Sequence, residues 1–148
     1  MNLEDFIDKQ GQRRVEQAVA QAERATSGEV CVHVTPNCRG DVMKRAVRTF
    51  NKLGLYQTKQ RNGVLIFVAY QSRKIAILGD VGINEKVPMG FWDNQIATLA
   101  KSLAAGQTVE GLCQVVSEVG QRLSTYFPPL ADDENELPNE ISYDNDED

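Results

Sequence analysis

The sequence contains few of the residues that build metal centres and disulfide frameworks: of 148 residues, one is histidine and three are cysteine. Cys31, Cys38 and Cys113 are odd in number and form no Cys-x-x-Cys pair. Zinc sites and disulfide frameworks depend on such spacings or on paired cysteines, so the sequence argues against both. This cysteine usage is typical of a protein in a reducing compartment, and we expect a cytoplasmic location.

Long apolar runs are also missing. No stretch approaches the roughly 20 apolar residues that a membrane-spanning helix requires. The first residues, MNLEDFIDKQGQ, have neither the basic start nor the apolar centre of a signal peptide. We therefore expect no membrane partner and a monomeric protein.

Basic stripes interleaved with aromatic residues are absent too, which argues against a nucleic-acid partner. The net charge is -5, but nine of the 21 acidic residues lie in residues 131–148, where there is no Lys or Arg. The rest of the chain is basic by count, with 16 Lys and Arg against 12 acids. Such an acidic tail can fold back on a basic body or bind a protein partner.

The acidic tail contains an apolar segment, ELPNEISY. Its apolar side chains are typical of a docking segment and belong to Leu137, Pro138, Ile141 and Tyr143. We predict that residues 136–143 pack on a single domain formed by residues 1–130. Residues 144–148 are expected to be free, because a short run of acids has too little apolar surface to fold.

Hydrophobic periodicity predicts alternating helices and strands. Apolar residues at helical spacing predict helices over residues 3–25, 42–53, 90–106 and 108–126. Gly11 is a weak point in the first of these helices. Asp41 is placed to cap the second of these, with Val47 on its inner face. Runs rich in apolar and β-branched residues predict strands over residues 29–35, 64–70 and 75–79.

The arrangement of these elements predicts the fold class. A short QSRK turn between the last two strands indicates an antiparallel hairpin. Strands without polar alternation need helices on both faces. The prediction is an α/β fold, a three-layer α/β/α sandwich with a small mixed twisted sheet of about four strands flanked by helices.

Catalytic templates are scarce. Cys31 and His33 lie two residues apart on one strand face, which permits a Cys/His nucleophile. The valines around them favour a structural histidine instead. The sequence has no Gly-x-Ser-x-Gly, P-loop, dinucleotide fingerprint or EF-hand pattern, so it gives no support to the mechanisms that depend on them.

Oxygen-bearing side chains gather around the predicted strand ends. Asp80 directly follows a strand in LGDVGINEKVP, and Asn62 and Glu29 stand where two other strands start. Ligands of open α/β sheets gather beyond strand ends, and carboxylate and amide oxygens suit Ca²⁺ or Mg²⁺. The candidate metal ligands are Asp80, Asn62, Glu85, Asp93 and Glu29. Alternatively, Asp80 only caps the turn, and Gly79 and Gly82 supply backbone freedom.

The segment RNGVLIFVAYQSRKIAILGDVGINEKVP, followed by FWD, resembles the TPM domain, a family that includes thylakoid-lumen proteins and short bacterial forms. The resemblance spans roughly residues 5–127. It implies an α/β/α sandwich, divalent-cation binding and, from a plant branch, phosphatase activity. It places the acidic cluster at Asp80, with Asn62, Glu85 and Asp93 as further candidates, and so favours the ion site over a mere cap.

Three functions follow as hypotheses. The favoured one is a binding module that holds Ca²⁺ or Mg²⁺ through Asp80 and its neighbours. The second is a metal-assisted phosphatase acting on phosphomonoesters, in which a cation activates water and Arg61 or Arg73 binds the anion. The third is a protein-interaction adaptor that uses the acidic tail. No residue is assigned a catalytic role.

Overall fold

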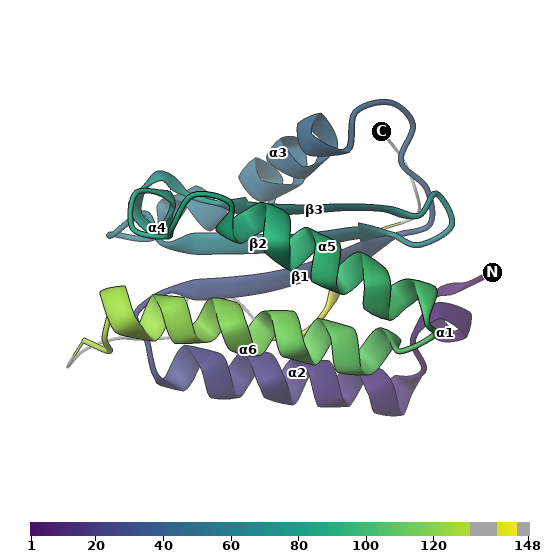
Figure 1. Cartoon of the computed structure of the whole chain (residues 1–148), viewed down its shortest axis with the longest axis horizontal. Coiled ribbons are helices and arrows are strands. Elements are labelled where there is room, and N and C mark those ends of the chain that lie inside the picture. Colours follow the sequence, from purple (N-terminus) through teal and green to yellow (C-terminus); the bar gives the residue numbers. More distant parts are fainter. Residues whose placement is uncertain (131–138, 145–148) are drawn as a thin grey trace.

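The sheet of this protein lies between two layers of helices. The computed structural model describes residues 1–130 and 139–144. Four strands, in the order β3-β2-β1-β4, form one mixed sheet with helices on both faces (Figure 1), which confirms the predicted α/β fold class. The strands are β1 (Glu29–Thr35), β2 (Gly63–Ala69), β3 (Lys74–Gly79) and β4 (Ser142–Tyr143).

The strand register brings the starts of β1 and β2 beside the end of β3. β1 and β2 are parallel, with Glu29 opposite Gly63, and β2 and β3 form the predicted antiparallel hairpin. Beyond β3, the Asp80 N–H donates to the carbonyl of Gly63 over 2.9 Å. Glu29, Gly63 and Asp80 therefore stand in one row across this edge of the sheet.

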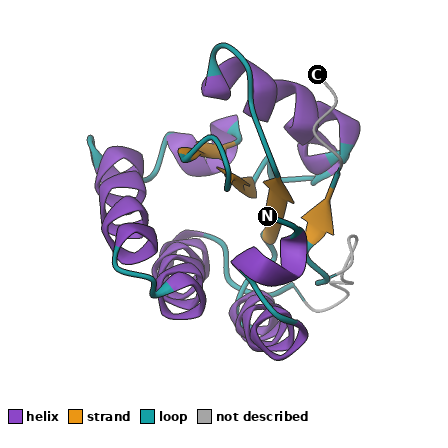
Figure 2. Ribbon diagram, turned by 90° about the vertical axis from the view of Figure 1, so that its right-hand side faces the viewer, coloured by secondary structure: helices purple, strands orange, loops and turns teal. Residues whose placement is uncertain are grey.

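The two helical layers differ in size (Figure 2). One face of the sheet packs against the larger layer: α1 (Leu3–Phe6), α2 (Lys9–Arg24), α5 (Phe91–Ala104) and α6 (Thr108–Tyr126). The other face packs against α3 (Val42–Lys52) and the 3-10 turn η1 (Leu55–Gln57). Strand alternation divides the core accordingly, because Val30, Val32 and Val34 face the larger layer while Cys31 faces α3.

The N-terminal segment is two helices rather than the one predicted. α1 ends at Phe6, and Asp8 begins α2 by accepting a hydrogen bond from the Gly11 N–H over 2.7 Å. Gly11 lies inside α2, where a Cβ would stand 2.7 Å from Val109 Cγ2. The break comes from the Asp8 cap, and Gly11 is present because α2 and α6 approach closely.

Helix α3 confirms the predicted cap but corrects its inner face. The Asp41 carboxylate accepts from the Met43 N–H over 2.9 Å. Val47 is 40% exposed, whereas Arg45 is 3% exposed with its guanidinium over the Phe67 ring. The inner face is rotated from the predicted one because Arg45 has partners that pattern alone does not reveal. Across the described ranges, no helix is both long and apolar enough to cross a membrane.

The C-terminal segment adds the fourth strand. Ile141 is buried, and β4 pairs in parallel with β1, with His33 opposite Ser142. Of the segment predicted to dock, residues 136–143, the structure describes only residues 139–143. Residues 136–138 and 145–148 lie outside the described ranges. Asp144, expected to be free, is instead bound to His33 and Arg45, because both side chains present donors to it.

Candidate functional site

Asp80 stands at the junction of β3 and α4 (Val81–Asn84), and its carboxylate is buried with both oxygens hydrogen-bonded. Asp80 Oδ1 accepts from the Val81 N–H over 2.8 Å, which caps the single turn of α4. Arg61 forms a two-pronged ion pair with it, with Nε 2.7 Å from Oδ2 and Nη2 2.8 Å from Oδ1. Asp80 thus caps the turn and also holds a charged partner.

Arg61 belongs to a tight loop before β2. Its backbone adopts the left-handed conformation, with φ of 53°, and its carbonyl accepts from the Gly82 N–H over 2.8 Å. The side chain remains 49% exposed. The hydrogen bond and charge of Asp80 raise the pKa of the Arg61 guanidinium, so the guanidinium stays charged at any ordinary pH.

The glycines on either side of Asp80 serve close packing rather than backbone freedom. Neither Gly79 nor Gly82 has a positive φ, which corrects the interpretation from sequence. A Cβ on Gly82 would stand 2.1 Å from the carbonyl oxygen of Gln60, and one on Gly79 would stand 2.5 Å from Trp92 Cζ2. The missing side chains let α4 and Trp92 lie directly against the sheet edge.

Asn62 is the next polar group at this edge and is 1% exposed. Its Nδ2 donates to Ser27 Oγ over 3.2 Å, and Ser27 Oγ donates to Gln60 Oε1 over 2.6 Å. Asn62 Oδ1 is buried and, among the residues the structure describes, receives no hydrogen bond. The Asn62 carbonyl accepts from the N–H of Glu29, which is 4% exposed, so Asn62 adjoins the row that contains Glu29 and Asp80.

Glu85 and Asp93 are placed differently from the first three candidates. Both are exposed: Glu85 ends α4 and Asp93 lies in the first turn of α5. The two segments are joined by a hydrogen bond of 2.9 Å from Trp92 Nε1 to Asn84 Oδ1. Residues 1–130 and 139–144 contain no group of three or more His, Cys, Asp or Glu that could hold a metal ion. Any ion here therefore needs amide, carbonyl or water oxygens as well.

Comparison with known proteins identifies the family. The family model of the TPM domain matches residues 1–122. The chain belongs to the TPM-domain family. It is also similar to the solved NMR structure of the BA42 protein from the psychrophilic bacterium Bizionia argentinensis, at 36% identity and a TM-score of 0.86, over 97% of this chain and 99% of that one. A search of curated proteins finds no match.

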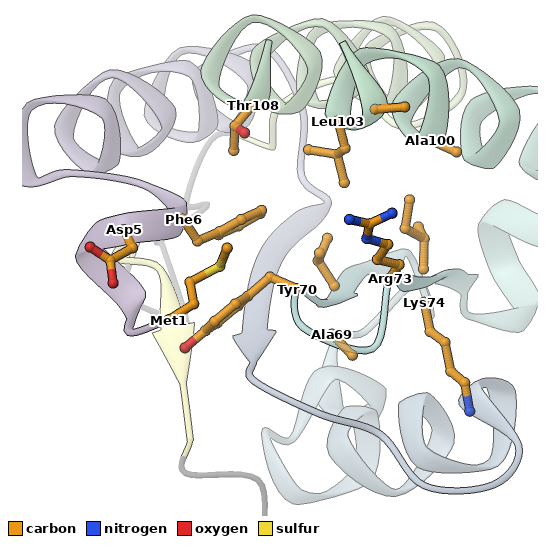
Figure 3. Close-up of a pocket in the computed structure, with 13 residues that line it drawn as sticks. Met1, Asp5, Phe6, Ala69, Tyr70, Arg73, Lys74, Ala100, Leu103 and Thr108 are labelled. Carbon is orange, nitrogen blue, oxygen red and sulfur yellow. The ribbon is translucent and has the colours of Figure 1, made fainter. Parts of the chain in front are cut away.

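The two arginines considered as anion-binding residues lie far apart in this TPM domain. Arg61 precedes β2, and Arg73 lies in the turn between β2 and β3, at the other end of the same strand. They therefore cannot act on one anion together. Arg61 is held by Asp80, whereas Arg73 points into a cavity (Figure 3).

A second polar group of the TPM domain, centred on His33, was not found from the sequence. His33 Nδ1 lies 2.8 Å from Ser142 Oγ, and Nε2 lies 2.9 Å from Asp144 Oδ2. Arg45 Nη2 contacts the same carboxylate at 3.0 Å. The signal that could have revealed this group is the two-residue spacing of Ser142 and Asp144, which places both on one face of a strand.

The His33 group is structural rather than catalytic. In a Ser-His-Asp triad, serine bonds to Nε2 and aspartate to Nδ1, which is the reverse of the contacts here. The ring is 4% exposed and stacks on Phe67 at 5.6 Å. Burial, with the charges of Glu23 and Glu29, raises the pKa of the Cys31 thiol to about 12, so a Cys31 thiolate nucleophile has no support.

Proposed function

We propose that this TPM domain is a binding module for a divalent cation, Ca²⁺ or Mg²⁺, held at the sheet edge by Asp80, Asn62 and Glu29. The observation that carries the proposal is Asn62 Oδ1, a buried acceptor with no hydrogen-bond donor among the described residues. Leaving such an atom unsatisfied costs roughly 1–3 kcal/mol. A cation, or a water bound to it, would remove that cost.

The donor chemistry of this edge fits a hard cation. Asp80 and Glu29 supply carboxylate oxygens and Asn62 an amide oxygen, which are the ligand types that Ca²⁺ and Mg²⁺ prefer. Mg²⁺ in particular keeps several waters and needs only one or two carboxylates. A site with fewer than three acidic ligands is therefore chemically adequate. Glu85 and Asp93, both exposed, are suited to outer contacts through water.

Arg61 competes with the proposed cation for the Asp80 carboxylate. Its guanidinium already neutralises Asp80, so a cation has to displace it. Because the Arg61 side chain is half exposed, it can turn into solvent at little cost in burial. Asp80 can keep its bond from the Val81 N–H, since a carboxylate oxygen accepts more than one partner.

Isothermal titration with Ca²⁺ and Mg²⁺ tests the proposal through two variants with opposite expected effects. Asp80→Asn keeps a good helix cap but removes the charge, and we expect a loss of at least about tenfold in affinity. Arg61→Gln removes the competing guanidinium, so we expect tighter binding than in the wild type.

The control for these titrations is Glu110→Gln in α6, which changes the net charge as Asp80→Asn does but at an exposed position. We expect it to bind cations as the wild type does. Unchanged binding by Asp80→Asn, or weaker binding by Arg61→Gln, would contradict the site. Glu85→Gln and Asp93→Asn should have smaller effects than Asp80→Asn if they contact the ion only through water.

A metal-assisted phosphatase is a second candidate, supported by the position of Arg61 beside Asp80. A guanidinium fork matches phosphate as well as carboxylate, and displacement from Asp80 would free it beside the ion. A bound divalent cation supplies Lewis acidity and a more acidic water. Metal-dependent turnover of p-nitrophenyl phosphate, lost in both Asp80→Asn and Arg61→Gln, is the expected result. Turnover that survives Asp80→Asn would show a contaminant or another site.

The adaptor role stays a prediction, because most of the acidic tail lies outside the described residues. A salt-sensitive pull-down that disappears when residues 131–148 are deleted would support it.

A further inference from the structure

A cavity of about 390 Å³ opens at the end of the sheet opposite Asp80 (Figure 3). It lies between α1, the turn that joins β2 to β3, and the adjoining ends of α5 and α6. The residues that matter for its chemistry are Met1, Phe6, Tyr70, Arg73, Leu103 and Thr108. No residue of the proposed cation site lines it, so the two can be tested separately.

One side of the cavity is aromatic. The Phe6 and Tyr70 rings are stacked with centroids 4.9 Å apart and planes 12° from parallel. Figure 3 shows the Met1 side chain beside them and Leu103 reaching down from α5. Such walls suit a flat apolar body, because aromatic groups prefer offset stacking or edge contacts with other rings.

Arg73 brings a positive charge to these apolar walls. Its guanidinium points into the cavity (Figure 3), and within residues 1–130 and 139–144 it makes no hydrogen bond or ion pair. Its φ of 57° is left-handed, a conformation that costs a non-glycine residue about 1–2 kcal/mol. Arg73 therefore brings to the cavity a guanidinium that has no partner among the described residues.

The other charged residues lining the cavity have partners elsewhere. Lys74 Nζ donates to the carbonyls of Cys38 and Gly40 over 3.0 and 2.8 Å. The Asp5 carboxylate caps α1 by accepting from the Asn2 N–H over 2.9 Å, and it points away from the cavity in Figure 3. Arg73 is therefore the charged side chain that remains to recognise a ligand among the described residues of this cavity.

We propose that this cavity binds a small aromatic monocarboxylate. The ring lies against Phe6 and Tyr70, and the carboxylate receives two parallel hydrogen bonds from the Arg73 guanidinium, a geometry that arginine favours. The cavity volume is near the lower limit of about 300–1,000 Å³ for small-molecule sites, which suits a single-ring acid better than a nucleotide.

Titration followed by amide chemical shifts tests the proposal with phenylacetate and its neutral isostere, phenylacetamide. Phenylacetate should shift the amides of Tyr70, Leu103 and Thr108 in a saturable manner, and phenylacetamide should bind at least about tenfold more weakly. Arg73→Gln should lower the affinity for phenylacetate by a similar factor. Arg73→Lys, which keeps the charge but not the fork, should fall between the two.

The matched control is Arg24→Gln, which removes an exposed arginine at the far end of α2 and should leave phenylacetate binding unchanged. Well-dispersed amide spectra of each variant establish that it is folded. Equal affinity for acid and amide, wild-type binding by Arg73→Gln, or no saturation at about 10 mM phenylacetate would overturn the proposal. Loss of cation binding by Asp80→Asn has no bearing on these outcomes.

Discussion

Gly82 lies in the turn of helix that follows Asp80, directly against the loop that carries Arg61. We expect Gly82→Ala to destabilise the fold by about 2–3 kcal/mol, because the new Cβ would overlap the Gln60 carbonyl oxygen and backbone yields poorly. The better helix propensity of alanine offsets at most about 1 kcal/mol of this. Urea unfolding of the variant and the wild type measures the difference.

Gly40 offers the matched comparison, since it has a φ of 80° but nothing within 4 Å of its ideal Cβ. Gly40→Ala should cost roughly 1 kcal/mol, the strain of a left-handed alanine alone. If Gly82→Ala cost no more than Gly40→Ala, close packing would not be the reason for glycine beside Asp80.

Strand β4 is short, but the segment that contains it makes contacts with β1 and with the core. It brings Ile141 into the core and Asp144 to His33 and Arg45. We expect a chain ending at residue 130 to lose about 2–4 kcal/mol of stability. Burial of Ile141 accounts for roughly 1.5–3 kcal/mol, and the loss of the ion pair between the buried Arg45 and Asp144 accounts for the rest. Thermal unfolding measures this as a lower Tm.

A chain ending at Asp144 is the control for this truncation, because it retains every described contact of β4 and lacks only residues 145–148. Its Tm should match that of the full chain. An unchanged Tm for the chain ending at residue 130 would mean that β4 adds no net stability.

The sequence predicted helices and strands correctly where the periodic pattern is long. It did not predict which side chains bind one another. The runs Glu29–Thr35 and Ile75–Gly79 have enough apolar and β-branched residues to specify strands. β4 has two residues and no pattern of its own, so only tertiary contacts define it. Asp80 was found because it follows a strand. Arg61 was predicted as an anion-binding residue, but its pairing with Asp80 was not, because a left-handed loop residue leaves no periodic signal.

The buried His33 makes the stability of the whole protein sensitive to acid. Burial lowers the pKa of His33 more than the hydrogen bond and charge of Asp144 raise it, and the charges of Arg45 and Lys52 lower it further. The folded protein therefore keeps the ring neutral at pH values where an unfolded chain, with a histidine pKa of about 6.5, already binds a proton.

The difference between the folded and unfolded pKa of His33 lowers the stability of the fold as the pH falls. Between the unfolded pKa of about 6.5 and the lower folded value, the unfolded state binds one more proton, so stability falls by up to about 1.4 kcal/mol per pH unit. We expect His33→Gln to lose less stability than the wild type in urea unfolding between about pH 8 and about pH 5. Asp144→Asn removes the group that raises the His33 pKa, so its decline should extend to lower pH. Equal pH dependence of the wild type and His33→Gln would show that His33 has the same pKa folded and unfolded.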